Sequence, residues 1–412
     1  MKALPYLTHE LPGIDGDIRQ RLEDFHVEEL PLYPASGQGT HVYFRVTKRG
    51  VPTPVAVRRI ARHMGVHPSA IGFAGLKDAK AATSQWMSLE FADEAQLARF
   101  RDSQVQIAEI TRHGNKLRPG HLAGNRFGIC IRGVGEAQLA AAQSVLGVLV
   151  HRGVPNFFGP QRFGARGDTA ALGAALLRND AEEFIRVYLG RAAPDDPPEC
   201  KAARDAFDAG FLDRAFQSWP RHYTDQRRAV TAYKRKGASA AVAAVDKRMK
   251  RLFVSAFQSE VFNEVLARRL DGIDRVLVGD WAQKTDTGGV FQVEDAAVEQ
   301  PRAEAFEISP TGPIIGSRCN LAGGSPGEIE REAIDACGIA MEGVARVGSL
   351  KVKGSRRALR FALIDPQLSA GEDEHGPFID VSFTSPSGCY ATVVLGEIMK
   401  SPPAAEGEVV DG

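Results

Sequence analysis

The segment GFAGLKDAKAATSQWMSL, residues 72–89, joins two closely spaced glycines to a run of alternating side chains. The glycines predict a tight loop, and Trp86 and Ser88, alternating with Met87 and Leu89, predict a strand after it. Asp78 lies in this loop, on backbone that the strand should order. An aspartate in such a turn usually accepts backbone N–H bonds, so the residues alone favour a capping role over a catalytic one.

The same loop lacks the pattern of a nucleotide-binding loop. A Walker A sequence has four residues between its first glycine and a Gly-Lys-Ser/Thr ending. Here Lys77 follows Leu76, and Asp78 stands where a hydroxyl would coordinate magnesium. We therefore do not expect a nucleotide-dependent enzyme.

Length and composition limit the possible classes of protein. A chain of 412 residues exceeds what one core usually fills, so we expect two domains or one domain with a large insertion. Five widely spaced cysteines with no Cys-x-x-Cys pair indicate neither a zinc site nor a disulfide framework, and they favour the cytoplasm. No apolar run approaches the ~18 residues of a membrane-spanning helix, and the first residues lack a signal peptide, so we expect no membrane association.

Elements that precede the loop have clear patterns. Val42, Phe44 and Val46 alternate with polar or larger side chains, which predicts a half-buried strand. Thr53 followed by Pro54 predicts a helix start with threonine as its N-cap, and Gly65 predicts its end.

A second unusual segment, GVPNFFGPQRFG, spans residues 153–164. Its three phenylalanines, separated by glycines and prolines, match neither a helix nor a regular strand. The rings either fill the core from a loop or form a platform for an unstacked base, with Asn156 and Gln161 able to contact its polar edge. The residues alone do not choose between these possibilities.

Positive charge is concentrated in two places although the formal net charge is zero. Residues 221–251 contain ten basic and two acidic side chains, which fits a solvated face or a surface that contacts phosphates. A second basic patch precedes Phe361. Between the two patches, the prolines and glycines of Ser309–Gly316 predict a rigid structural loop. The second patch consists of Lys351, Lys353, Arg356, Arg357 and Arg360.

Four motifs together resemble the TruD family of pseudouridine synthases, in order and spacing, over nearly the whole chain. They are FHVEE (residues 25–29), GFAGLKD (72–78), NFFGPQRFG (156–164) and SPTGP (309–313). The resemblance implies an α+β fold: a pseudouridine synthase catalytic domain with a mixed, largely antiparallel sheet flanked by helices. That domain is expected to comprise residues 1–180 and 355–412, interrupted by an inserted α+β TRUD domain at residues 181–354.

The resemblance also implies a function. The family isomerises uridine at position 13 of tRNA without cofactor or metal, and we expect a cytoplasmic monomer that needs no protein partner. Asp78 matches the family's catalytic aspartate, with Arg19 as the neighbouring cation. Side chains expected around the target base are Phe25, Asn156, Phe158 and Tyr390. Relatives usually carry lysine at the Arg19 position and phenylalanine at the Tyr390 position; arginine keeps the charge but changes its shape, and tyrosine adds a hydroxyl.

One ionised carboxylate suffices for this isomerisation, either as a nucleophile or as a base, and the sequence leaves the route open. The target base must be flipped out of the RNA fold, at a cost that stacking on aromatic rings partly offsets. Two other hypotheses remain at this point. One is a synthase that acts on another RNA, and the other is a catalytically silent RNA-binding protein or chaperone.

Overall fold

The computed structural model describes residues 3–340, 344, 346–347 and 350–401. Its chain divides into two compact units. The sheet unit comprises Tyr6–Val154 and the segment from Phe361 onward, and the helical unit comprises Pro155–Arg360 with the residues up to Pro5. Residues 1–2 and 402–412, the outer ends of the expected catalytic domain, lie outside the described residues.

The boundary of the helical unit differs from the expected boundary of the inserted domain. Residues 155–180 belong to the helical unit, where α4 (Thr169–Leu177) packs on α9 (Lys247–Arg268). Gly173 permits this contact, because a Cβ there would lie 2.1 Å from the carbonyl oxygen of Phe253. The extent of the family's inserted domain, residues 181–354, stays a prediction.

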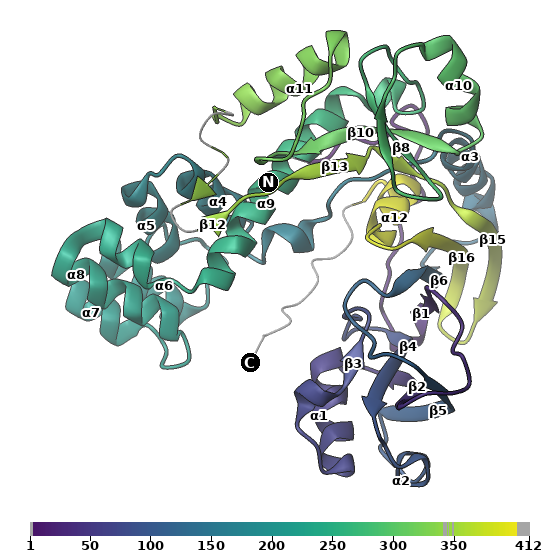
Figure 1. Cartoon of the computed structure of the whole chain (residues 1–412), viewed down its shortest axis with the longest axis horizontal. Coiled ribbons are helices and arrows are strands. Elements are labelled where there is room, and N and C mark those ends of the chain that lie inside the picture. Colours follow the sequence, from purple (N-terminus) through teal and green to yellow (C-terminus); the bar gives the residue numbers. More distant parts are fainter. Residues whose placement is uncertain (1–2, 341–343, 345, 348–349, 402–412) are drawn as a thin grey trace. The chain divides into compact units, whose positions relative to one another are not determined.

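One sheet organises the sheet unit (Figure 1), and among the described residues it has eight strands. Only β1 and β4 pair in parallel within it, so the expected mixed, largely antiparallel sheet is confirmed. Its strands in order are β15 (Ile364–Asp373), β16 (Gly376–Pro386), β6 (Leu122–Arg132), β1 (Phe25–Pro31), β4 (Ala82–Glu90), β2 (His41–Arg49) and β5 (Val105–His113), with β3 (Gly72–Phe73) beside β4.

The helices of this unit are α1 (Thr53–Met64), α2 (Glu94–Ala98), α3 (Glu136–Arg152) and α12 (Ala391–Met399). The predicted alternation in β2 is confirmed, because Val42, Phe44 and Val46 lie in one core cluster with residues of α1. Gly65 ends α1 in the left-handed conformation, with φ of 69°, as glycine allows.

The predicted N-cap of α1 is wrong. Pro52 occupies the N-cap position, and the Thr53 hydroxyl instead donates to Oε1 of Gln85 at 2.8 Å. Thr53 is fully buried, so its hydroxyl bonds to the strand beneath it rather than to the helix backbone.

The helical unit combines a helical core with a small sheet of order β13-β10-β8-β9. The loop predicted at Ser309–Gly316 is instead largely strand β10 (Ile308–Ile314), which pairs with β8 and β13. Its two prolines, Pro310 and Pro313, lie within this paired strand. The loop prediction failed because it used only the local content of glycine and proline. That content does not reveal that strands on both sides form hydrogen bonds with this segment.

The remaining elements of this unit complete its core. Within the described residues, every helix of the chain is too short or too polar to cross a lipid bilayer.

Besides α4 and α9, the helices of the helical unit are α5 (Ala181–Leu189), α6 (Pro198–Asp208), α7 (Leu212–Ser218), α8 (Thr224–Ala244), α10 (Ala296–Glu304) and α11 (Gly324–Ala336). The strands are β8 (Trp281–Lys284), β9 (Val290–Gln292), β11 (Arg346–Val347), β12 (Leu350–Lys351) and β13 (Ser355–Ala358). The short strands β7 (Val154–Pro155) and β14 (Arg360–Phe361) pair with each other, and each has one residue in either unit.

Candidate active site

The parallel pair of strands brings Asp78 and Arg19 to the same edge of the sheet. His26 of β1 lies opposite Ala82 of β4, so the residues before each strand meet at that edge. Asp78 belongs to the loop before β4 and Arg19 to the segment before β1. The Nη2 of Arg19 lies 2.9 Å from Oδ2 of Asp78, which makes a charge-assisted hydrogen bond.

Arg19 is constrained by its backbone and by an aromatic ring. Its φ of 61° is in the left-handed region, which is costly for a residue with a Cβ. The Cζ of Arg19 lies 4.2 Å from the ring centroid of Phe25, which is itself 1% exposed. The Asp78 side chain remains 34% exposed, so the carboxylate is accessible to a substrate. The guanidinium of Arg19 is held in place by its contact with the Phe25 ring.

A buried lysine holds the backbone of the Asp78 loop. Nζ of Lys48, on β2, donates to the carbonyl oxygens of Lys77 at 3.2 Å and Asp78 at 2.7 Å. Lys48 is fully buried, and burial lowers the pKa of its ammonium from 10.5 to about 8, although the charge of Asp78 opposes this shift. Lys48 was not among the residues singled out by the sequence.

Further bonds fix the rest of this loop. Nζ of Lys77 forms a buried ion pair with Glu29 at 2.8 Å, and the Lys77 N–H donates to the Thr53 hydroxyl at 2.9 Å. Nε2 of Gln85 donates to the carbonyl of Gly75 at 3.0 Å. The carboxylate therefore projects from backbone that is bonded at Gly75, Lys77 and Asp78, which limits the reorganisation needed before reaction.

Tyr390, also in the sheet unit, occupies the N-cap position of α12 and is partly exposed. It follows β16, whose last residue, Pro386, pairs with Gly124. Gly124 in turn lies opposite Leu30, whereas Phe25 stands at the other end of β1. The sheet register thus places the last residue of β16 level with the end of β1, whereas Arg19 and Asp78 lie before the first residues of β1 and β4.

Asn156 and Phe158 lie together in the helical unit. The N–H of Phe158 donates to Oδ1 of Asn263 at 2.9 Å, and Nδ2 of Asn263 donates back to the Phe158 carbonyl at 3.0 Å. Two guanidinium groups lie over the Phe158 ring, with Cζ of Arg357 at 4.3 Å and Cζ of Arg162 at 5.5 Å from its centroid. The ring is partly exposed and carries two cation–π contacts.

The Asn156 amide is engaged inside its own unit. It is 5% exposed, its Nδ2 donates to the Ala358 carbonyl at 2.9 Å, and its Oδ1 accepts from Arg357. The other rings of this segment, Phe157 and Phe163, are buried at 2% and 4% exposure, so the core-filling alternative is correct for these two.

Comparison with known proteins identifies the family. The model of tRNA pseudouridine synthase D (TruD) matches residues 3–398. A protein named tRNA pseudouridine synthase D from Geobacter sp. (strain M21) is 40% identical over 398 residues, covering 96% of this chain and 99% of the relative. The chain belongs to the TruD family. A relative of that name from Geobacter metallireducens is also 40% identical, over 96% of this chain and 97% of its own.

A crystal structure agrees with the TruD assignment. It is of a Methanosarcina mazei protein provisionally assigned as tRNA pseudouridine synthase D (TruD), and it matches with a TM-score of 0.86 at 27% sequence identity. The match covers 97% of this chain and 96% of that chain. The expected fold, a pseudouridine synthase domain with an inserted domain, is thereby confirmed.

Sequence reasoning missed three residues that support the TruD motifs, namely Lys48, Asn263 and Arg357. The predicted strand with Val42, Phe44 and Val46 on one face ends two residues before Lys48, and the sequence gives no sign that the Nζ of a lysine there is buried. Asn263 lies among the apolar residues of a long helix, where a polar side chain at a buried position could have drawn attention. Arg357 was noted only as part of a basic patch.

Proposed function

We propose that this chain isomerises uridine to pseudouridine at position 13 of tRNA, with Asp78 as the catalytic carboxylate. The observation that carries the proposal is the partly exposed Asp78 carboxylate, bonded to Arg19 at 2.9 Å and projecting from a loop fixed by Lys48. The family membership supports the reaction class, and the Asp78 motif GFAGLKD supports the role of the residue.

The reaction needs no oxidant and no water. The N1–C1′ bond of the uridine breaks, the uracil turns, and C5 bonds to C1′; C5 then loses a proton and N1 gains one. Asp78 either adds to the substrate and leaves again, or removes a proton from the ribose. Arg19 orients the carboxylate and places a positive charge beside it in the resting enzyme.

From the TruD resemblance we propose that Phe25, Asn156, Phe158 and Tyr390 contact the flipped uracil. Phe25 is 1% exposed and lies under the Arg19 guanidinium, so its contact requires Arg19 to move off the ring. Since two guanidinium groups lie over the Phe158 ring, the base would replace one of them when it stacks. Asn156 would exchange one of its internal hydrogen bonds for one to the uracil. Stacking contributes about 1–3 kcal/mol per base and offsets part of the cost of flipping.

Replacing Asp78 with asparagine tests the catalytic assignment. Asp78→Asn should abolish pseudouridine at position 13, detected by chemical labelling and primer extension, while the dissociation constant for tRNA stays within about twofold. Asp15→Asn is the matched control, since Asp15 is an exposed carboxylate of the same unit. Turnover by Asp78→Asn at the wild-type rate would refute the role of Asp78.

Mapping pseudouridine in total RNA from cells with and without the gene decides the substrate. Loss of the modification at position 13 of tRNA alone supports the proposal. Loss at sites in another RNA identifies a synthase with a different substrate, and an unchanged map identifies a silent RNA-binding protein.

A further inference from the structure

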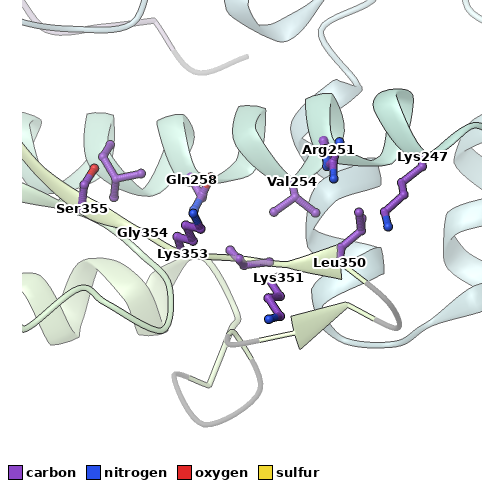
Figure 2. Close-up of a pocket in the computed structure, with 11 residues that line it drawn as sticks. Lys247, Arg251, Val254, Gln258, Leu350, Lys351, Lys353, Gly354 and Ser355 are labelled. Atoms are coloured by element: carbon purple, nitrogen blue, oxygen red, sulfur yellow. The ribbon is translucent and has the colours of Figure 1, made fainter.

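A groove within the helical unit joins the two basic segments of the sequence. It has a volume of about 660 Å³ and lies between the first half of α9 and residues 350–355 (Figure 2). In Figure 2, Val254 and Gln258 point from the helix toward the strand segment on the other side. Four of the lining residues are basic: Lys247 and Arg251 from α9, and Lys351 and Lys353 from the facing segment.

Among the described residues, no carboxylate lines the groove. All four basic side chains are exposed, and within the described residues none of them forms an ion pair or a side-chain hydrogen bond. Four like charges around one concavity repel each other, and this repulsion is relieved when an anion binds between them.

Other basic residues of the same two sequence segments form bonds within the protein. Arg227 donates to the carbonyls of Phe216 and Trp219, both at 2.7 Å, and Lys234 pairs with Asp213. From the second patch, Arg356 forms a buried ion pair with Glu330, and Arg360 is 2% exposed. The fold thus uses these arginines for its own structure and leaves the groove cations available to a ligand.

The floor of the groove is rigid. Nε2 of Gln258 donates to the Ile315 carbonyl at 2.6 Å, which ties α9 to the segment after β10. Gly354 has a φ of 69°, and a Cβ there would lie 2.6 Å from the Ile314 carbonyl oxygen. Only glycine allows so close an approach, so the spacing between the two walls is set before any ligand binds.

We infer that this groove binds the phosphate backbone of the RNA substrate, as a site separate from the residues proposed to contact uracil. The inference rests on the proposed function, which supplies the polyanion. Lysines act as point charges toward phosphates and Arg251 can donate two hydrogen bonds to one phosphate. The described residues of the lining include no aromatic ring on which a base could stack, so the groove contributes affinity and position without reading sequence.

Salt-dependent binding of full-length protein to unmodified tRNA tests the inference. The groove variant carries Lys247→Gln, Arg251→Gln, Lys351→Gln and Lys353→Gln. The matched control carries Lys201→Gln, Arg221→Gln, Arg235→Gln and Lys236→Gln, which removes the same charge from exposed positions of the same unit. Each lost phosphate contact should lower the magnitude of the slope of log K against log salt by about 0.7–0.9, so the four substitutions of the groove variant should lower it by about 3.

We expect affinity at 0.1 M salt to fall about tenfold or more in the groove variant, with little change in the control and in the single-turnover rate at saturating tRNA. Equal slopes in groove variant and control would overturn the inference. If thermal melting shows the fourfold variant unfolded, Lys351→Gln/Lys353→Gln is used, with an expected slope change of about 1.5. If the groove variant shows the predicted change in slope but the wild-type protein forms no pseudouridine, the proposed function is wrong and the inference about the groove stands.

Discussion

The Asp78 loop and the Asn156–Gly164 segment are both rich in glycine, yet they are fixed in opposite ways. In the Asp78 loop most bonds go to the backbone, from Lys48 and Gln85, while the carboxylate pairs with Arg19 and remains 34% exposed. In the second segment the functional side chains themselves are engaged: both polar atoms of the Asn156 amide are hydrogen-bonded, and guanidinium groups lie over Phe158.

This difference separates the work that each region does. A carboxylate on a fixed loop is preorganised, which favours a group that acts in the chemical step. A ring and an amide with internal partners must exchange those partners for the base, which favours groups that capture substrate. We therefore expect changes around Asp78 to lower the single-turnover rate and changes around Phe158 to weaken binding.

The strongest test of the comparison within the Asp78 region is Arg19. Arg19→Gln removes the charge-assisted bond to Asp78, and a bond of that kind is worth about 1.5–3 kcal/mol, so the single-turnover rate should fall about 100-fold. Arg19→Lys keeps the charge and should recover most of the rate. A glutamine variant with the wild-type rate would show that the ion pair has no part in the reaction.

The buried lysine is the next test. Lys48→Met keeps the length of the side chain but removes the donor to two carbonyls, so the Asp78 loop loses its anchor and the rate should fall about 30-fold. Its free energy of unfolding at pH 7 should change by less than about 1 kcal/mol, since burying an ammonium is itself costly. Lys80→Met, at an exposed position of the same loop, is the control and should retain the wild-type rate.

Phe158 tests the second region. Phe158→Leu keeps an apolar side chain but removes the stacking surface, so binding of tRNA in the flipped state should weaken about tenfold. The effect is measured as a higher tRNA concentration for half-maximal single-turnover rate. Phe158→Tyr retains the ring and should behave like wild type; equal behaviour of the leucine variant would assign the ring to the core.

The smallest expected effect is a pH dependence from Lys48. Its folded pKa of about 8 lies below the ordinary 10.5, so between these values the unfolded chain binds a proton that the folded chain lacks. The free energy of unfolding of wild type should therefore rise with pH in this window, relative to Lys48→Met, by about 2 kcal/mol between pH 7.5 and 9.5. Urea unfolding of both proteins at these two pH values measures it, and a constant difference would contradict it.

Much of the sheet unit was predictable, because its patterns are local. The alternation at Val42–Val46, the strand after the Asp78 loop and the end of α1 at Gly65 all depend on residues adjacent in sequence. The prediction failed at Thr53, whose hydroxyl bonds to Gln85, 32 residues away. It failed again at Ser309–Gly316, where neighbouring strands impose a ladder on a segment rich in proline and glycine.

By itself the sequence determined the family, the α+β class and the candidate carboxylate, since motif spacing and short-range periodicity survive without coordinates. Only the tertiary structure decided which charges are buried and which face solvent. Lys48 lies beneath a loop 30 residues away in sequence, Arg356 pairs with Glu330 across 26 residues, and Lys351 remains exposed in the groove that Arg251 also lines. A long charged side chain takes its role from whatever surrounds its end, and folding brings those surroundings from remote parts of the chain.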